Sequence, residues 1–256
     1  PQQRSSAASD VYKRQLGEIA DLFDTFLLDA FGVLNVGDTA IAGAAQRAQM
    51  LKDMGKDVLV LTNGACFPAE QALKKFLSFG IPLEIADIVS SRAALAAAIP
   101  PLPDRGFWGV MSTQNSHVET LGIPWKRLEN DMSIYDAASG FILLSTLEWT
   151  EAQQMLLQES LSKVARPILV GNPDIVAPRG GYLSLEPGYY GHKLGSELKI
   201  QAKFFGKPFT NIYDLAFSRL PDIDPSRVVM VGDTLHTDCL LYTSDAATIA
   251  VVVMWG

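Results

Sequence analysis

Acidic and lysine side chains stand close to where apolar segments of this sequence end. Asp29 ends the apolar run in TFLLDAFGVL, Asp233 ends the run in RVVMVGDT, and Lys207 precedes the latter in FFGKPFT. A carboxylate can attack phosphorus when a divalent cation and a lysine neutralise the anionic groups that approach it. We therefore interpret Asp29 as a candidate nucleophile, Lys207 as a fixed positive charge, and Asp233 as an oxygen ligand for Mg²⁺, a hard cation.

A third polar segment completes this set. Thr62, Asn63 and Gly64 directly follow the apolar run DVLVL. The Thr62 hydroxyl and the backbone N–H groups of Asn63 and Gly64 are candidates for binding phosphoryl oxygens, together with Lys207. Each signal alone has an ordinary structural interpretation, because an Asp after an apolar run usually caps a turn or a helix. Their occurrence together, at successive segment ends, is what predicts a phosphate site.

Alternating strands and helices must position these residues. Apolar strands are expected within 25–34, 57–64 and 227–234, and amphipathic helices over 40–55 and 68–80, each ending at a glycine. Continuous Val, Ile and Leu runs joined by helices indicate a parallel sheet that is covered on both faces. In such α/β sheets ligands bind outside the carboxyl ends of the strands. The predicted site lies at that edge.

The middle of the chain, residues 104–195, has strands and a helix of its own. Glycine and proline cluster in IPPLPDRG and EPGYYGHKLGSE, which we interpret as the boundaries of this part. The expected organisation is a core domain over 16–103 and 196–256 with an inserted α/β domain over 104–195. One continuous larger sheet is the alternative. Residues 1–15 are polar and without periodicity, which predicts a disordered or non-native tail, and 239–256 is suspect as native sequence.

Composition excludes several functional classes. The formal net charge of −7 argues against a nucleic-acid or anionic-membrane surface, since both require clustered Lys and Arg. The two cysteines lie far apart and in no metal-ligand spacing, which favours a reduced, cytoplasmic protein. No apolar run approaches the roughly 20 residues of a membrane span. The expected partner is a small molecule.

The segments together resemble the four motifs of the haloacid dehalogenase-like (HAD) superfamily of phosphohydrolases. LLDAFGVLN matches the first motif, VLTNG the second, GKP the third and VGDTLHTD the fourth. The resemblance is to subfamily IIA, whose members include p-nitrophenyl, pyridoxal and phosphoglycolate phosphatase-like proteins. It implies a Rossmann-like parallel sheet with a large inserted α/β cap, and a phosphohydrolase acting on a small phosphorylated metabolite. A homodimer is a further expectation, because caps in this branch can carry dimer contacts.

The resemblance also implies roles for particular residues. Asp29 would take the phosphoryl group as an aspartyl-phosphate, which water then hydrolyses. Mg²⁺ would be held by Asp29, by the main-chain carbonyl of Phe31 and by Asp233, while Asp238 would orient a metal-bound water or Lys207.

The inserted domain contributes candidate substrate residues. The segment GNPDIVAPRGG resembles a cap segment of this branch and contains Asn172 and Asp174. Tyr189 and Tyr190, in the glycine-flanked PGYYGHK, could stack on a planar substrate.

One position departs from the pattern. Most phosphatases of the superfamily have a second Asp where this chain has Phe31, and that Asp protonates the leaving oxygen. Such a group contributes about 10²–10⁴-fold, so a weak or specialised phosphatase is expected, with His192, His236 or Glu186 as substitute acids. The alternatives are a binding protein without turnover, or a non-hydrolytic enzyme that cleaves carbon–phosphorus bonds.

Overall fold

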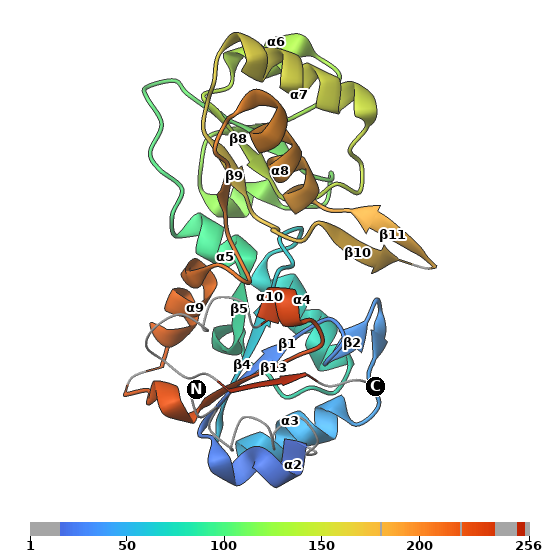
Figure 1. The fold of residues 1–256 in the computed structure, drawn as a ribbon, viewed down its shortest axis with the longest axis vertical. Coiled ribbons are helices and arrows are strands. Elements are labelled where there is room, and N and C mark those ends of the chain that lie inside the picture. Colours follow the sequence, from blue (N-terminus) through green and yellow to red (C-terminus); the bar gives the residue numbers. More distant parts are fainter. Residues whose placement is uncertain (1–15, 180, 221, 239–249, 254–256) are drawn as a thin grey trace, which may run out of the picture. The chain divides into compact units, whose positions relative to one another are not determined.

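The computed structural model describes residues 16–179, 181–220, 222–238 and 250–253 (Figure 1). The predictions for residues 1–15, and for 239–256 apart from one strand, lie outside these residues. The chain forms two compact units. The first comprises residues 1–62, 69–89 and 207–256, and the second comprises 63–68 and 90–206. Among the described helices, none has both the length and the apolar character that crossing a bilayer requires.

A five-stranded sheet organises the first unit. Its order is β14-β13-β1-β4-β5, and β1 pairs in parallel with both β13 and β4. The strands are β1 (Thr25–Asp29), β4 (Asp57–Thr62), β5 (Ile88–Ser90), β13 (Val228–Gly232) and β14 (Ala250–Val253). Parallel pairing brings the carboxyl ends of β1, β4 and β13 to one edge, where the motif residues follow. The predicted α/β fold with a parallel sheet is confirmed.

Helices cover this sheet and bury both of its faces. They are α2 (Leu16–Ile19), η1 (Ala20–Leu22), α3 (Ala44–Asp53), α4 (Ala69–Ser78), η2 (Ile85–Asp87), α9 (Thr210–Phe217), η4 (Pro225–Arg227) and α10 (Leu235–Asp238), with a short hairpin of β2 (Asn35–Val36) and β3 (Thr39–Ala40). Alternate side chains of β1, Phe26 and Leu28, pack in one cluster with Leu51 of α3 and Phe76 of α4. Leu27, on the other face, is also fully buried.

The two predicted helices after β1 and β4 are confirmed, and each is followed by a glycine. Gly55 and Gly80 have φ values of +72° and +74°. Side chains with a Cβ rarely adopt this left-handed conformation, so these glycines let the chain turn back toward the sheet.

A second five-stranded sheet organises the second unit, in the order β12-β9-β8-β6-β7, with all neighbours parallel. The strands are β6 (Trp108–Met111), β7 (Trp125–Arg127), β8 (Gly140–Leu143), β9 (Ile168–Val170) and β12 (Lys203–Phe204). The remaining elements are α5 (Ser91–Ala96), η3 (Val118–Leu121), α6 (Met132–Ala137), α7 (Glu151–Lys163), α8 (Pro187–Leu198) and the antiparallel hairpin β10 (Val176–Arg179) and β11 (Tyr182–Leu185). This unit includes more of the sequence than residues 104–195, the range expected for an inserted domain. The assignment of the unit as a cap stays a prediction.

The expectation of a boundary at EPGYYGHKLGSE is wrong, because α8 runs through it. Pro187 occupies the first helical turn, where its missing N–H costs nothing. A Cβ on Gly188 would overlap the carbonyl oxygen of Pro173, and one on Gly191 would lie 2.7 Å from Cγ2 of Val170. These glycines therefore allow close packing and do not mark a loop.

Candidate active site

Asp29 ends β1 in a buried position. It is 9% exposed and lies opposite Leu61 in the register with β4, so Thr62 follows at the same sheet edge. The backbone N–H of Ala30 donates a hydrogen bond of 2.6 Å to Asp29 Oδ1. This bond orients the carboxylate at the carboxyl end of the strand.

Lys207 connects Asp29 to Asp238. Its Nζ atom lies 2.6 Å from Asp29 Oδ1 and 2.7 Å from Asp238 Oδ1, and the lysine is 2% exposed. Burial alone would lower the pKa of Lys207, but the two carboxylates outweigh it and hold the pKa above its ordinary value. Lys207 is therefore a permanent positive charge in this site.

The nucleophile candidate is harder to ionise than an ordinary Asp. Burial raises the pKa of Asp29 to about 7, the charge of Asp238 adds to this, and Lys207 opposes it. A lysine that faces a carboxylate usually lowers the pKa of that carboxyl group. Here the single lysine serves two carboxylates, so one negative charge stays without a counter-charge. A further cation at this edge would favour the ionised form of Asp29.

Three carboxylates meet beside this lysine. One oxygen each of Asp29, Asp233 and Asp238 lies within 4.8 Å of the others. With Lys207, their formal charges sum to −2, which a divalent cation would balance. Carboxylate oxygens are the ligands that Mg²⁺ prefers. The residues present therefore fit a Mg²⁺ ion.

Two glycines make room for these carboxylates. A Cβ on Gly32, whose φ is +82°, would overlap the carboxylate of Asp233, and a Cβ on Gly232 would overlap that of Asp238. The hydroxyl of Thr234 donates a hydrogen bond of 2.9 Å to Asp233, and its backbone N–H donates one of 3.2 Å to Asp238. The loop after β13 thus holds both acids with its own donors.

Phe31 stands two residues after Asp29 and is half-buried. It forms an isolated bridge with Asn35, and the neighbouring Gly32 N–H donates to the Asn35 carbonyl at 2.9 Å. This turn shapes the backbone at position 31, while the phenyl ring supplies no ionisable group. The role of its carbonyl as a metal ligand stays a prediction.

Asn63 and Gly64 belong to the second unit, although they directly follow Thr62. Asn63 Nδ2 donates a hydrogen bond of 2.8 Å to Asp174 Oδ1, and its carbonyl accepts one of 2.8 Å from the Ser91 hydroxyl. The structure thus brings together two predicted site residues, Asn63 and Asp174, that are far apart in the sequence. Phosphoryl binding by Thr62, Asn63 and Gly64 stays a prediction.

Sequence reasoning missed Arg92, which is 4% exposed on α5. Its guanidinium donates to the carbonyls of Ala65 at 3.0 Å and His117 at 2.7 Å, and to the Thr120 hydroxyl at 3.0 Å. Together with Ser91 it fixes the segment that carries Asn63. The only sequence signal is a charged residue within the otherwise apolar RAALAAAI, a pattern that by itself predicts no more than a helix.

Asn172 and Asp174 form a turn after β9 in the second unit. The backbone N–H of Asp174 donates to Asn172 Oδ1 at 3.0 Å, and Asn172 Nδ2 donates to Glu186 Oε2 at 3.2 Å. Glu186 is 3% exposed and also accepts bonds from Arg179 and Ser184. These contacts give Glu186 the position of a structural acceptor within the second unit.

The two tyrosines lie on α8. Tyr189 and Tyr190 contact each other edge-to-face with ring centroids 5.2 Å apart, and Tyr190 packs against the hydrophobic core of the second unit. Both are half-buried, and their role in substrate stacking stays a prediction. The ring of His192, a candidate acid, stacks on the ring of Phe204 with centroids 4.5 Å apart. The side chain of His236, another candidate, lies outside the part that the structure describes.

Two curated relatives align over most of this chain. A NipSnap protein of Caenorhabditis elegans is 28% identical over 87% of the chain, which covers 47% of that protein, so the chain spans about half of that relative. The 4-nitrophenylphosphatase of Schizosaccharomyces pombe is 22% identical over 88% of the chain and 81% of its own length.

A solved structure and two family profiles agree with these alignments. The crystal structure of a possible sugar phosphatase from Cytophaga hutchinsonii, described as a member of the HAD superfamily, has a TM-score of 0.78 at 25% identity and covers 88% of this chain and 82% of that one. The haloacid dehalogenase-like hydrolase profile matches residues 26–121, and the HAD-hydrolase-like profile matches 204–248. These matches include the segments that carry Asp29, Thr62, Lys207 and Asp233. The chain belongs to the haloacid dehalogenase-like hydrolases.

Proposed function

We propose that this chain is a Mg²⁺-dependent phosphohydrolase that acts on a small phosphorylated metabolite through an aspartyl-phosphate on Asp29. The observation that carries the proposal is the buried contact of Asp29 with Lys207, beside Asp233 and Asp238. Relatives named for phosphatase activity, the 4-nitrophenylphosphatase and the possible sugar phosphatase, support the reaction class and a small substrate.

Asp29 and Asp233 would hold the Mg²⁺ ion, with the carbonyl of Phe31 as a further oxygen ligand and Asp238 as the residue that orients Lys207. When bound, the ion would neutralise phosphoryl oxygens and favour ionised Asp29.

In the first step, an oxygen of Asp29 attacks phosphorus and the bond to the leaving oxygen breaks. Lys207, held permanently charged, stabilises the negative charge on the transferred phosphoryl group. The Thr62 hydroxyl and the N–H groups of Asn63 and Gly64 would position that group. Water then attacks the phosphorus of the aspartyl-phosphate, which releases phosphate and restores the carboxylate. Catalysis rests on positioning and charge neutralisation.

Phe31 limits this reaction, because a phenyl ring can neither protonate the leaving oxygen nor activate water. Leaving groups that need little protonation should therefore react best. The same observation favours a second candidate function, in which the chain binds a phosphorylated ligand without turning it over. Of the candidate acids with a described side chain, Glu186 accepts three hydrogen bonds within the second unit and His192 stacks on Phe204, so neither set of contacts favours the residue as a replacement for the missing Asp.

A steady-state assay with p-nitrophenyl phosphate and Mg²⁺ distinguishes the two candidates. Turnover that Asp29→Asn abolishes, with unchanged circular dichroism, would support the hydrolase, because an amide of the same shape cannot attack phosphorus. Asp57→Asn is the matched control, since Asp57 is exposed at the opposite end of the adjacent strand. Wild-type turnover in the Asp29 variant would refute the nucleophile assignment. Saturable phosphate binding without any turnover would establish the binding protein.

The remaining expectations stay proposals about the whole protein. A cytoplasmic location accords with the acidic chain and its two widely separated cysteines. A homodimer would be checked by light scattering.

A further inference from the structure

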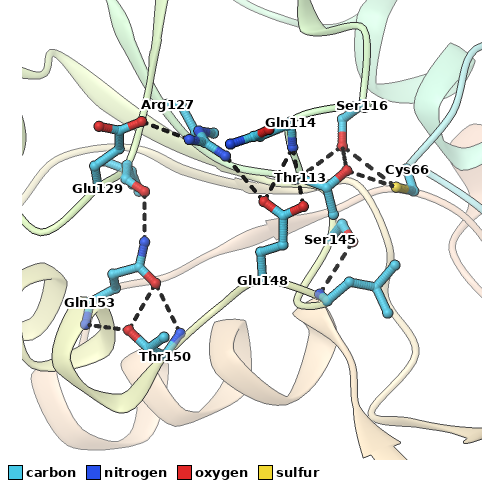
Figure 2. A network of polar contacts seen from close by, with 12 residues as sticks. Cys66, Thr113, Gln114, Ser116, Arg127, Glu129, Ser145, Glu148, Thr150 and Gln153 are labelled. Atoms are coloured by element: carbon cyan, nitrogen blue, oxygen red, sulfur yellow. Dashed lines mark hydrogen bonds and ion pairs between the residues drawn. The ribbon is translucent and has the colours of Figure 1, made fainter.

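The segment of residues 63–66, which would bind phosphoryl oxygens under the proposed function, is anchored at its far end. Arg92 donates hydrogen bonds to two of its carbonyls, at 3.0 and 3.4 Å. Figure 2 shows Cys66 beside Thr113 and Ser116, and its Sγ atom lies 3.7 and 3.5 Å from their hydroxyls. These contacts all lie within the second unit. The near end of the segment is fixed by other groups.

Asn63, at the near end, is held by both its side chain and its carbonyl. It is 7% exposed, its Nδ2 donates to Asp174 Oδ1 at 2.8 Å, and its carbonyl accepts from the Ser91 hydroxyl at 2.8 Å. A Cβ on Gly206 would lie 2.6 Å from Asn63 Oδ1 and 2.7 Å from Cβ of Ser91. Because Gly206 directly precedes Lys207 in the chain, the amide of Asn63 lies between Asp174 and the backbone that leads to this lysine.

The backbone of Asp174 is fixed in turn by its neighbours in the second unit. Its N–H donates to Asn172 Oδ1 at 3.0 Å, and its carbonyl accepts from the Gly188 N–H at 3.0 Å. Asn172 is itself held by Glu186, which is 3% exposed. The turn therefore presents the Asp174 carboxylate in one place. These bonds use only the backbone of position 174, so the turn should persist when its side chain is changed.

The charge of Asp174 favours a contact with Asn63 over a contact with a phosphoryl group. A carboxylate and a phosphate are both anionic, so they repel each other at short distance. A hydrogen bond from a neutral amide to a carboxylate is, in contrast, roughly twice as strong as one between two neutral groups. Asp174 is thus suited to hold Asn63 and poorly suited to bind the phosphoryl group itself.

We propose that Asp174 is a positioning residue for phosphoryl transfer, which acts through the side chain of Asn63 and does not touch the substrate. This inference rests on the proposed function, in which the N–H groups of Asn63 and Gly64 bind the phosphoryl group. Without the carboxylate, the Asn63 side chain loses its acceptor and the backbone N–H groups beside it are held less firmly. A misplacement of about 1 Å in a positioning group can cost about 10²-fold in rate.

Steady-state kinetics with p-nitrophenyl phosphate and Mg²⁺, together with calorimetric titration of inorganic phosphate, test the proposal. Asp174→Ala should lower kcat/KM by about 10- to 100-fold and raise the Kd of phosphate, with unchanged circular dichroism. Asp174→Asn keeps an acceptor oxygen in the same place and should recover most of the loss. Asp131→Ala is the matched control, because Asp131 lies in the same unit, is exposed, and accepts a bond of 2.9 Å from the Ser133 N–H before α6. It removes an equal charge and should leave kcat/KM unchanged.

A double-mutant cycle tests whether Asp174 acts through Asn63. In the background of Asn63→Ala, which keeps the backbone N–H, Asp174→Ala should cause no further loss of kcat/KM. A further loss of the same size as in the wild-type background would overturn the proposal, because Asp174 would then act independently of Asn63. Losses that differ between p-nitrophenyl phosphate and an alkyl phosphate would also overturn it, since they would indicate a direct contact with the leaving group.

The remaining outcomes separate this inference from the proposed function. Turnover that Asp29→Asn abolishes but Asp174→Ala leaves unchanged would overturn this inference alone. If the chain binds phosphate without turnover, an unchanged Kd in Asp174→Ala would overturn it in the same way. A wild-type chain with neither turnover nor phosphate binding would overturn both. If Asp174→Ala does not fold, Asp174→Ser, whose oxygen lies one bond closer to the backbone, should show the same losses.

Discussion

Replacing Lys207 by Met would leave Asp29 and Asp238 buried without their counter-charge. Methionine has similar length, so the change removes the charge and three donors with little loss of volume. Breaking a buried ion pair by removing one partner costs about 3–5 kcal/mol, because an uncompensated charge remains in a poorly solvated site. Lys207 is 2% exposed and lies within 2.7 Å of both acids, so the full range applies.

The loss of stability caused by Lys207→Met should depend on pH in the metal-free protein. Burial and Asp238 already raise the pKa of Asp29 to about 7, far above the about 3.9 of an unfolded chain. The folded state therefore binds more protons, and its stability falls as pH rises from about 4 through 7. Without Lys207 this pKa rises further. At pH 5.5 Asp29 is largely protonated in both proteins, so the difference between them should be larger at pH 8.

Urea unfolding in EDTA at pH 5.5 and 8 would measure the effect. Lys75→Met is the control, since Lys75 pairs with the exposed Asp38 and should cost at most about 1 kcal/mol. The triple variant with Asp29→Asn and Asp238→Asn should recover most of the lost stability. A loss below 1 kcal/mol, an equal loss at both pH values, or no recovery in the triple variant would refute the reasoning.

Three further predictions concern the metal, the missing acid and the buried arginine. Mg²⁺ at 100 times its Kd should stabilise the chain by about 2.7 kcal/mol in thermal or urea unfolding, and Asp233→Asn should remove most of this gain; equal stabilisation of both proteins would contradict the metal site. Phe31→Asp should raise turnover of alkyl phosphates more than that of p-nitrophenyl phosphate, because alkoxide leaving groups need protonation; equal gains would show that the missing acid is not limiting. Arg92→Met should lower the free energy of unfolding by about 3 kcal/mol, since it leaves buried carbonyls without donors. Hydrogen exchange should increase over residues 63–66, and unchanged exchange there would argue against Arg92 as their anchor.

Local patterns in the sequence determined the elements of the first unit and the ends of its strands. Continuous apolar runs identified β1, β4 and β13, and glycines at positions 55 and 80 marked the ends of two helices. Because the carboxyl ends of parallel strands meet at one edge, the sequence alone assigns Asp29, Thr62 and Asp233 to a common site. The residue pattern also supplied Lys207, and the motif resemblance added Asp238.

Only the tertiary structure decided which of these groups touch and with what electrostatic result. The contacts of Lys207 with two carboxylates depend on distances between segments that are far apart in the sequence. The raised pKa of Asp29 depends on burial, which outweighs the opposing effect of Lys207. The link between Asn63 and Asp174 and the anchoring role of Arg92 are long-range in the same way. No local pattern encodes these contacts. Any polar side chain can hydrogen-bond to water until folding removes that water and brings a protein group into its place.

The glycines of α8 show that local sequence patterns also fail to predict packing contacts. Glycine is favoured both where the backbone must turn with positive φ and where another segment approaches too closely for a Cβ. At Gly55 the first reason holds, and the sequence interpretation was right. At Gly188 the carbonyl of Pro173 supplies the second reason, and the predicted boundary is a helix. The two cases look alike in the sequence, since the neighbour that distinguishes them is brought there only by folding.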